Sequence, residues 1–364
     1  MRTSVVKLLA AGAMTLALTA VAPAQEAPVL QGKSAEEKAR ISVLIEAAKK
    51  EGAVSYWDAV VQPQTHEAMV VAFKKLYGLP DSFEVNYTLS NTVGLITRVD
   101  QEINANRVTM DVAAVGSPTW VFEKVEAGQV LQYDSPQYEK YDRAFAQGLG
   151  QKGYFAFNGA YMFVPMWSED HLKFAGKSYK DVLKAAPAGR MSLGDASKSA
   201  TYLTTYHGQS QLLDKSFFEE MAKLKPSFIV RSEQIAGRLV TGEDLMAYSG
   251  MPTRAYQYNQ KGAKLKFMIP QEGVVMLPQA MFILKQAPHP NAAKLWIDFV
   301  LSEEGQQILV KGEALMSGRS GFKSPLPEYA PPIESLKLIK VDWKALSTEQ
   351  LKKVREQWTK IYNP

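Results

Sequence analysis

Residues 274–310 read VVMLPQAMFILKQAPHPNAAKLWIDFVLSEEGQQILV and predict a strand, a turn and two helices. Val274–Leu284 carries no charged residue, which is typical of a buried strand. The Pro-His-Pro step at 288–290 predicts a tight turn. Asn291–Val300 then repeats apolar residues at helical spacing, and Ser302–Val310 predicts a second helix. A buried strand followed by an amphipathic helix indicates a layered α/β protein.

The amino-terminal part alternates helices and strands in the same way. Ser34 and Glu37 have the spacing of a capping box at the start of a helix over Ala35–Lys50, and Ala53–Trp57 predicts a buried strand. This alternation predicts a doubly wound α/β layer. The further elements are helices over 65–77, 93–104 and 118–127 and strands over 83–88 and 110–115.

A less regular stretch, Leu131–Gly153, separates this part from a second α/β set. That set begins with the apolar run Tyr154–Trp167 and ends with an amphipathic helix over Thr348–Tyr362. A chain of 364 residues is long enough for two domains. The elements between these two are strands over 190–193 and near 245–248, a helix from about 201 and a helix over 215–224.

Residues 1–24 have the pattern of a cleavable secretory signal. Arg2 and Lys7 give a basic start, Leu8–Val21 is apolar, and Ala22-Pro23-Ala24 supplies small residues for the peptidase. The apolar run is shorter than the roughly 20 residues of a membrane-spanning helix. We therefore expect cleavage near Ala24/Gln25 and a periplasmic mature protein.

Charge and cysteine content narrow the function classes. Without the leader, 40 Lys and Arg face 37 Asp and Glu, a net charge of +3 with no dense basic block. Nucleic acid is therefore not expected as a partner, whereas an anionic ligand suits the charge. With no Cys, the protein has neither disulfides nor thiolate chemistry and depends on its core.

Several stretches, in this order, resemble the extracellular solute-binding proteins of ABC importers. The resemblance is to the branch that contains ferric-ion-, phosphonate- and sugar-phosphate-binding proteins. The block Ser302-Glu303-Glu304-Gly305-Gln306, with the turn and helix before it, is the most specific part. The other matching stretches are 44–52, 111–117, 127–128, 195–201, 241–243 and 288–294 with Phe299.

The resemblance implies a type 2 periplasmic-binding fold, in which two doubly wound α/β lobes are joined by two crossover strands. Lobe one would comprise residues 35–130 and 279–312, and lobe two residues 131–278 and 313–364. The ligand would lie in the cleft between them. We expect a monomer that delivers its ligand to an ABC permease in the inner membrane, without cofactor or metal.

In such a fold, ligand contacts are expected where strands end and the following helices begin, because unpaired N–H groups there favour anions. For each candidate residue the alternative is a purely structural role, as a helix cap or as a core side chain. By this rule the candidates are Tyr56, Trp57 and Asp58; Ser90, Asn91 and Thr92; Ser117; Tyr161; Ser197, Ser199, Ala200 and Thr201; and Tyr248, Ser249 and Arg254.

Asp195–Thr201 is the preferred anion site. The resembling family often has Asp-Pro-x-x-Ser-Gly-Thr here, and its backbone N–H groups hold an anionic group. This chain keeps Asp195, Ser199 and Thr201 but has Ala196 and Ala200 in place of Pro and Gly. Arg254 suits a bidentate contact with a carboxylate or phosphonate, or is a solvated surface residue.

The two alternatives to binding an organic anion are binding of ferric iron and enzymatic catalysis. Ferric-binding relatives use two adjacent Tyr after the segment matching 241–243, but this chain has only Tyr248 there and no Tyr-Tyr pair anywhere. We therefore expect an organic anion (a carboxylate, phosphonate or phosphate ester) over Fe(III). No nucleophile-elbow, zinc-protease or phosphate-loop motif supports the other alternative, a secreted hydrolase.

Overall fold

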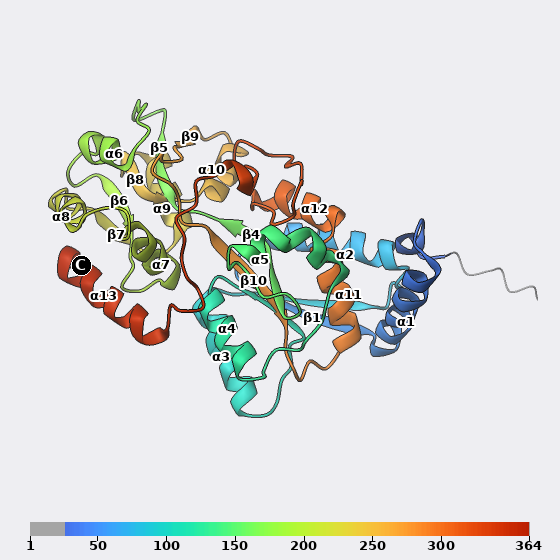
Figure 1. The fold of residues 1–364 in the computed structure, drawn as a ribbon. Helices are drawn as coiled ribbons and strands as arrows, with labels where there is room; N and C mark the ends of the chain where they lie inside the picture. The colour runs from blue at the N-terminus through green and yellow to red at the C-terminus, as the bar shows by residue number, and fades with distance from the viewer. Residues whose placement is uncertain (1–25, 364) are drawn as a thin grey trace, which may run out of the picture.

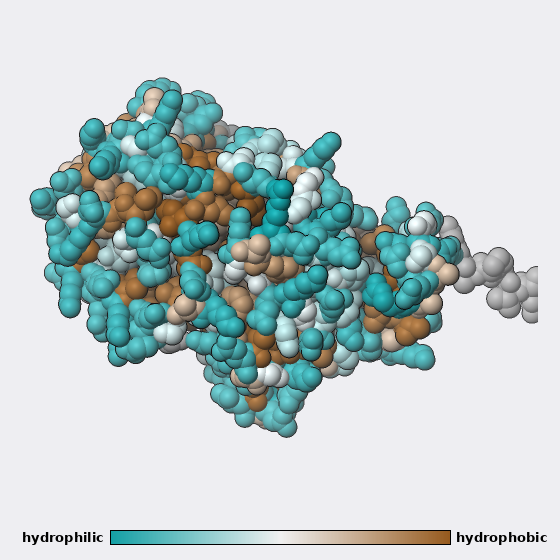
Figure 2. Space-filling model, viewed as in Figure 1, coloured by the Kyte–Doolittle hydropathy of each residue, from teal (hydrophilic) through white to brown (hydrophobic). Residues whose placement is uncertain are grey.

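The computed structural model describes residues 26–363, so the predicted leader lies outside the described residues. The chain forms two five-stranded sheets, each with its own helices (Figure 1). No described helix has the length and apolar character needed to cross a membrane. On the face drawn in Figure 2, hydrophilic side chains cover most of both lobes, and hydrophobic residues reach the surface mainly in the middle of the molecule.

The first sheet has the order β2-β1-β3-β10-β4. β1 pairs in parallel with β2 and β3, whereas β10 runs antiparallel between β3 and β4. A strand from late in the chain therefore lies inside a sheet built from the amino-terminal half. The strands are β1 (Ala53–Asp58), β2 (Glu84–Leu89), β3 (Val112–Val115), β4 (Phe155–Tyr161) and β10 (Leu277–Ile283).

The helices of this lobe are α1 (Ala35–Glu51), α2 (Pro63–Tyr77), α3 (Thr92–Asn104), α4 (Pro118–Glu126), α5 (Asp142–Ala146), α11 (Pro290–Val300) and α12 (Glu303–Glu313). Ser34 and Glu37 form the predicted capping box of α1. Two short 3-10 helices, Pro28–Leu30 and Pro136–Tyr141, complete the lobe.

The second sheet has the order β7-β6-β8-β5-β9. β6 is parallel to β7 and β8, and β5 is antiparallel to β8 and β9. The strands are β5 (Val164–Ser168), β6 (Met191–Gly194), β7 (Ser227–Ile229), β8 (Met246–Gly250) and β9 (Leu265–Phe267). The helices are α6 (Tyr179–Ala185), α7 (Ala200–Gln209), α8 (Lys215–Lys223), α9 (Ser232–Thr241), α10 (Pro252–Asn259) and α13 (Thr348–Tyr362).

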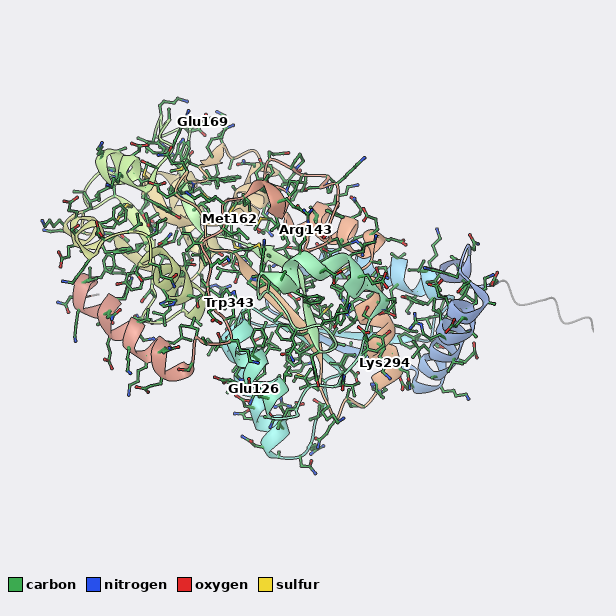
Figure 3. The ribbon with its side chains drawn as sticks, viewed as in Figure 1. Glu126, Arg143, Met162, Glu169, Lys294 and Trp343 are labelled. Carbon is green, nitrogen blue, oxygen red and sulfur yellow. The ribbon has the colours of Figure 1, made fainter. Side chains whose placement is uncertain are left out.

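Two segments of the chain pass between the sheets before the carboxyl-terminal part begins. The first is Met162-Phe163, which links β4 to β5, and Figure 3 shows Met162 between the lobes. The second, residues 268–276, links β9 to β10. The apolar run Tyr154–Trp167, expected to begin the second α/β set, is therefore divided between β4 of the first sheet and β5 of the second. The predicted start of lobe two at Leu131 differs from this arrangement, because β4 pairs with β10 in the first sheet.

The carboxyl-terminal segment contacts both lobes. Met316 forms a bridge with Ala160, and Leu338 forms another with Val274 at the second crossover; between these bridges lies the 3-10 helix Ile333–Ser335. Thr119 Oγ1 in α4 then donates to the carbonyl oxygen of Trp343 at 2.9 Å. The chain ends with α13, which packs on α7 and α8 of the second lobe.

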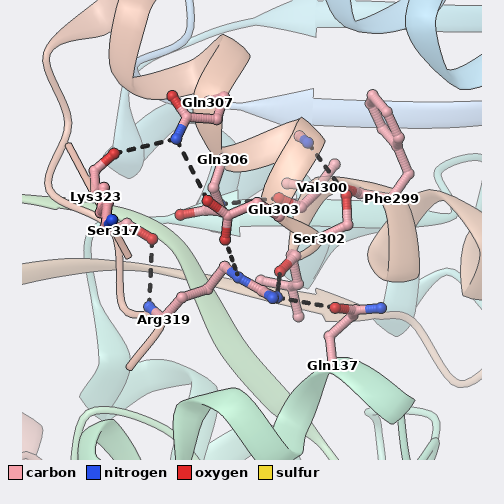
Figure 4. A network of polar contacts seen from close by, with 12 residues as sticks. Gln137, Phe299, Val300, Ser302, Glu303, Gln306, Gln307, Ser317, Arg319 and Lys323 are labelled. Atoms are coloured by element: carbon pink, nitrogen blue, oxygen red, sulfur yellow. Dashed lines mark hydrogen bonds and ion pairs between the residues drawn. The ribbon is translucent and has the colours of Figure 1, made fainter. Parts of the chain in front are cut away.

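The block Ser302–Gln306, the most specific part of the resemblance, has a structural role. Ser302 caps α12, with its Oγ accepting from Gly305 N at 3.1 Å. The buried Gln306 donates through Nε2 to the carbonyl oxygens of Asn158 in β4 and Val300 in α11, each at 2.8 Å (Figure 4). Arg319 reaches Glu303 Oε2 at 3.3 Å and Gln137 Oε1 at 2.8 Å. These bonds join α11, α12 and β4.

An aromatic cluster joins α2, β1, β2 and α11 beneath the first sheet. His66 stacks on Tyr87 with ring centroids 4.0 Å apart, and Tyr56 lies 5.3 Å from Trp296. His66 is only 5% exposed, and its Nδ1 has no partner among the described residues. This burial lowers the pKa of His66 to about 4, so the folded state holds the neutral imidazole.

A substitution at Gly305 would test how closely the start of α12 packs against the end of α11. A Cβ at this position would lie 2.2 Å from the carbonyl oxygen of Phe299 and 2.9 Å from that of Val300. We expect Gly305→Ala to lower the free energy of unfolding by about 1–3 kcal/mol in urea titrations. The control is Gly237→Ala in α9, whose added Cβ meets only Tyr258 Oη at 3.4 Å and should be neutral or stabilising. Equal stability of the two variants would contradict this account.

Because His66 is buried as the neutral imidazole, we expect the stability of the folded protein to fall in acid. Its folded pKa of about 4 is below the ordinary value of 6.5, so its stabilising effect is complete above pH 6.5 and is lost as pH falls through 4. At about 1.4 kcal/mol per pKa unit, the loss is on the order of 3 kcal/mol. Chemical denaturation from pH 7 to 4 should show a flatter profile for His66→Phe than for the wild type. Parallel profiles would mean that His66 is not the titrating group.

Candidate ligand-binding cleft

A cleft of about 720 Å³ opens between the two sheets, and both lobes line it. Residues after β1 and β2 form one wall, and residues after β6, β7 and β8 form the other, with Tyr161 at the end of β4 and Phe163 of the first crossover between them. The wall of lobe one consists of Ala59, Val60, Gln62 and Leu89–Val93. The wall of lobe two consists of 198–202, 230–233, Met251 and Arg254.

The helices that begin at the cleft include α3, α7 and α9, whose N-cap residues Asn91, Ser199 and Arg231 belong to the lining. Asn91 caps α3, accepting from Gly94 N at 2.8 Å. Ser199 caps α7, accepting from Tyr202 N at 3.4 Å, and its Oγ lies 3.1 Å from Thr201 Oγ1. The remaining first-turn N–H groups have no helical acceptor, and together with the helix dipoles they make this side of the cleft favourable for an anion.

The charged groups of the cleft are mostly positive. Lys198 and Arg231 have side chains that are 71% and 72% exposed. Arg254 is buried and pairs with Glu233, the one carboxylate of the lining, at 2.5 Å. Its Nε donates to Ser232 Oγ at 3.1 Å and its Nη1 to Gln257 Oε1 at 2.7 Å, so it also fixes the start of α9 against α10.

At the base of the cleft, β3, β4 and β10 of lobe one pack closely together, and Thr201 of lobe two approaches Gly116, since its Cγ2 would lie 3.3 Å from a Cβ added there. A Cβ on Gly116, at the end of β3, would lie 2.9 Å from Gln279 Oε1 and 3.0 Å from Tyr161 Oη. Gly116 N donates to Thr92 Oγ1 at 3.3 Å. The Gln279 amide is fully buried, and neither of its polar atoms has a partner within residues 26–363. A side chain at position 116 would have to displace the ends of the Gln279 and Tyr161 side chains.

Eight of the fifteen predicted contacts line the cleft. They come from two strand-to-helix junctions, the end of β4 and α10, as the strand-end rule anticipates. The eight are Ser90, Asn91, Thr92, Tyr161, Ser199, Ala200, Thr201 and Arg254.

Asp58 lies behind the wall and shapes it. Its Oδ1 accepts from Val60 N and Val61 N at 2.6 and 2.7 Å, and its Oδ2 accepts from Tyr56 Oη and, at 2.8 Å, from Asn158 Nδ2. Burial raises the pKa of this carboxyl, and the four hydrogen bonds partly oppose that effect. The side chain thereby fixes the loop after β1, in which Ala59 and Val60 face the cleft.

The other predicted contacts also lie outside the lining. Trp57 Nε1 donates to Ser55 Oγ at 3.2 Å, and Ser117 precedes α4 without forming a cap bond. Ser197 bonds to Asp195, and Tyr248 Oη donates to Gln209 Oε1 at 3.2 Å within the core of lobe two. The remaining two, Tyr56 and Ser249, are buried.

Sequence reasoning missed one wall segment, Val230–Glu233. It follows the three-residue strand β7 and begins α9, neither of which was predicted. The same strand-end rule would have selected these residues once β7 was known. The strand-end rule selects polar groups at helix starts, so it did not predict the apolar lining residues Leu89, Val93, Phe163 and Met251.

Comparison with known proteins supports a single assignment. The family model for bacterial extracellular solute-binding proteins matches residues 108–334. An uncharacterized protein of Haemophilus influenzae is 26% identical over 305 residues, covering 80% of this chain and 86% of that one.

Solved structures share the fold. AfuA from Actinobacillus pleuropneumoniae, with fructose-6-phosphate bound, has a TM-score of 0.70 at 18% identity, covering 85% of this chain and 98% of that one. A substrate-binding protein of an ABC transporter from Agrobacterium tumefaciens gives 0.72 at 14%, covering 85% and 94%. Iron-bound HitA from Pseudomonas aeruginosa gives 0.67 at 18%, covering 85% and 99%.

At these identities the structural matches establish the type 2 periplasmic-binding fold and leave the ligand open. The family model covers more than half of the chain and includes both crossovers and β10. The chain belongs to the bacterial extracellular solute-binding proteins, the periplasmic substrate-binding components of ABC importers.

Proposed function

We propose that this protein captures a small organic anion (a carboxylate, phosphonate or phosphate ester) in the cleft and delivers it to an inner-membrane permease as a monomer. The observation that carries the proposal is the meeting of three helix starts with Lys198 and Arg231 in one cleft. A secreted hydrolase is no longer an alternative, because the family consists of binding proteins.

The electrostatics of the cleft favour an anion over a cation. An anion near a helix start gains about 0.3–1 kcal/mol when exposed and up to about 2 kcal/mol when partly buried. The lining holds three cationic side chains and one carboxylate, and that carboxylate already pairs with Arg254. Lys198 and Arg231 also have carboxylate neighbours, Asp195 at 3.4 Å and Glu233 at 3.9 Å, but their side chains are 71% and 72% exposed, so they are the cations that a ligand in the cleft can reach.

The size of the cleft favours an organic molecule. Small-molecule sites usually measure about 300–1,000 Å³, and this cleft measures about 720 Å³. We propose that the eight lining residues predicted from the sequence contact the ligand, with Ser199, Ala200 and Thr201 at the anionic group. Trp57, Ser117, Ser197 and the other residues outside the lining would act through the shape of the walls.

Fe(III) is the second candidate, since iron-bound HitA shares the fold. The phenols available in the cleft are Tyr161 and Tyr202, and burial raises the pKa of both, which disfavours phenolate ligands. Within residues 26–363, no three His, Asp or Glu side chains are placed to hold a metal. Fe(III) requires several hard oxygen donors, so the donor set supports an organic anion instead.

We also propose lobe limits that follow the sheets. Lobe one would comprise residues 26–161 and 277–318, and lobe two residues 162–276 and the final helix α13. The two crossovers then serve as hinges, with Met162-Phe163 and 268–276 at the change of sheet. Closure about these segments would bring the two walls together on the ligand.

A ligand screen tests the proposal. Thermal shifts of the mature chain should appear with carboxylates, phosphonates or phosphate esters and not with polyamines or Fe(III). A ligand at about a hundredfold its Kd stabilises the folded state by about 2.7 kcal/mol. The double variant Lys198→Gln/Arg231→Gln should bind the best anion about 5- to 10-fold more weakly, with less salt dependence, because two attractive charges are lost.

The matched control changes the same charges elsewhere. Lys352 and Arg355 are exposed on α13, away from the cleft lining, so Lys352→Gln/Arg355→Gln should leave affinity unchanged. A thermal shift with Fe(III) alone would contradict the proposal. So would equal losses of affinity in the two double variants, because the effect would then come from net charge and not from the cleft.

A further inference from the structure

Exposed aliphatic side chains gather at the cleft. Among the described residues, eight large aliphatic side chains are substantially exposed, and three of them lie in the 21-residue lining. These are Leu89 (39%), Val93 (55%) and Val230 (44%). Since water-exposed apolar groups that cluster in a groove usually mark a binding surface, their position calls for an apolar partner.

The three side chains belong to opposite walls. Leu89 ends β2 and Val93 lies in the first turn of α3, both in lobe one. Val230 follows β7 and precedes α9 in lobe two. Val60, Phe163 and Met251 extend the apolar lining between them. A ligand between the walls would therefore have hydrocarbon on both sides.

The planar polar side chains of the lining already have protein partners. Gln62 Nε2 donates to the carbonyl oxygen of Val60 at 3.0 Å, and Asn91 Oδ1 accepts from Gly94 N. Glu233 and Arg254 pair with each other. Hydroxyl side chains of the lining gather at the helix starts, at Ser90, Thr92, Ser199 and Thr201. The lining therefore offers a polar site for an anion at these helix starts and a hydrocarbon site between Leu89, Val93 and Val230.

We infer that the ligand is an amphiphilic oxyanion. Its carboxylate, phosphonate or phosphate head lies at the starts of α3 and α7 near Lys198 and Arg231. Its alkyl or aromatic body lies between Leu89 and Val93 on one side and Val230 on the other. This inference rests on the proposed anion-binding function and specifies the ligand further, since it selects an apolar body over a sugar.

A chain-length series tests the ligand class. The probes are methyl-, propyl- and hexylphosphonate, the matching carboxylates acetate, butyrate and heptanoate, and glucose 6-phosphate, titrated into the mature chain by calorimetry. Each buried methylene should strengthen binding about two- to fourfold, as expected for hydrocarbon leaving water. Hexylphosphonate should bind at least tenfold tighter than glucose 6-phosphate, and comparison with heptanoate identifies the preferred head.

Paired valine variants test the wall. Val93→Thr/Val230→Thr keeps the shape of both side chains but makes them polar, so it should at least halve the affinity gain per methylene. The control is Val43→Thr/Val71→Thr, which changes two more exposed valines (70% and 69%) on α1 and α2 outside the lining and should keep the full gain.

The outcomes separate the two proposals. If short anions bind but length adds no affinity, or if glucose 6-phosphate binds tightest, the amphiphilic ligand is excluded and the organic-anion function stands. If the gain per methylene survives in Val93→Thr/Val230→Thr, the assigned wall is wrong. If none of these anions binds, both proposals fail.

Discussion

The antiparallel pairing of β10 with β3 and β4 is the constraint on which the rest of the molecule depends. Ala280 and Phe282 of β10 lie opposite Val115 and Ala113 of β3, and the other edge of the strand pairs with Phe157 and Phe155 of β4. Without β10, the first sheet would separate into β2-β1-β3 and an isolated β4.

The elements that follow β10 extend the same constraint. α11 packs on α1 and β1, and α12 packs on α2 and β4. Gln306 adds hydrogen bonds from α12 to Asn158 and Val300. A single lobe is thus completed from two distant parts of the chain. The chain must cross to the second lobe and return for this to happen, which requires the two crossovers between the sheets.

Long periodic segments were predictable from the sequence, and short ones were not. The helix α1 was predicted because it has both a capping box and an apolar stripe, and α13 was predicted to the residue. The strands β7 and β9 have three residues each, too few to show a period. The change of sheet at Met162-Phe163 lies inside a continuous apolar run, so local sequence carries no sign of it.

The site was predictable to the extent that the strand-end rule applies. The rule located the polar residues before α3 and α7, because helix starts are visible in the sequence. It does not say which strand face a side chain occupies, and in β1 the alternation buries Tyr56 and Asp58 within the lobe. It also cannot show that Tyr248 faces a core packed with Tyr179 and Phe217.

Buried charges hold the walls of the cleft in place. Glu313, at the end of α12, accepts from Gln62 N at 2.8 Å and Thr65 Oγ1 at 2.6 Å, and Gln257 Nε2 of lobe two reaches it at 3.3 Å. Burial raises the pKa of this carboxyl. With Asp58 and Arg254, Glu313 fixes backbone and helix starts before a ligand arrives, which reduces the ordering that binding would otherwise require.

The positions of the chain ends allow the relative movement of the two lobes to be followed by fluorescence energy transfer. The described chain begins beside α1 on lobe one, and α13 ends on lobe two, so the two ends lie at opposite extremes of the molecule (Figure 1). A donor dye at Glu26 and an acceptor at Asn363 would therefore sit on different lobes and outside the cleft lining. Energy transfer between the two dyes would change as one lobe rotates against the other. Neither sheet would need to carry a label or an insertion.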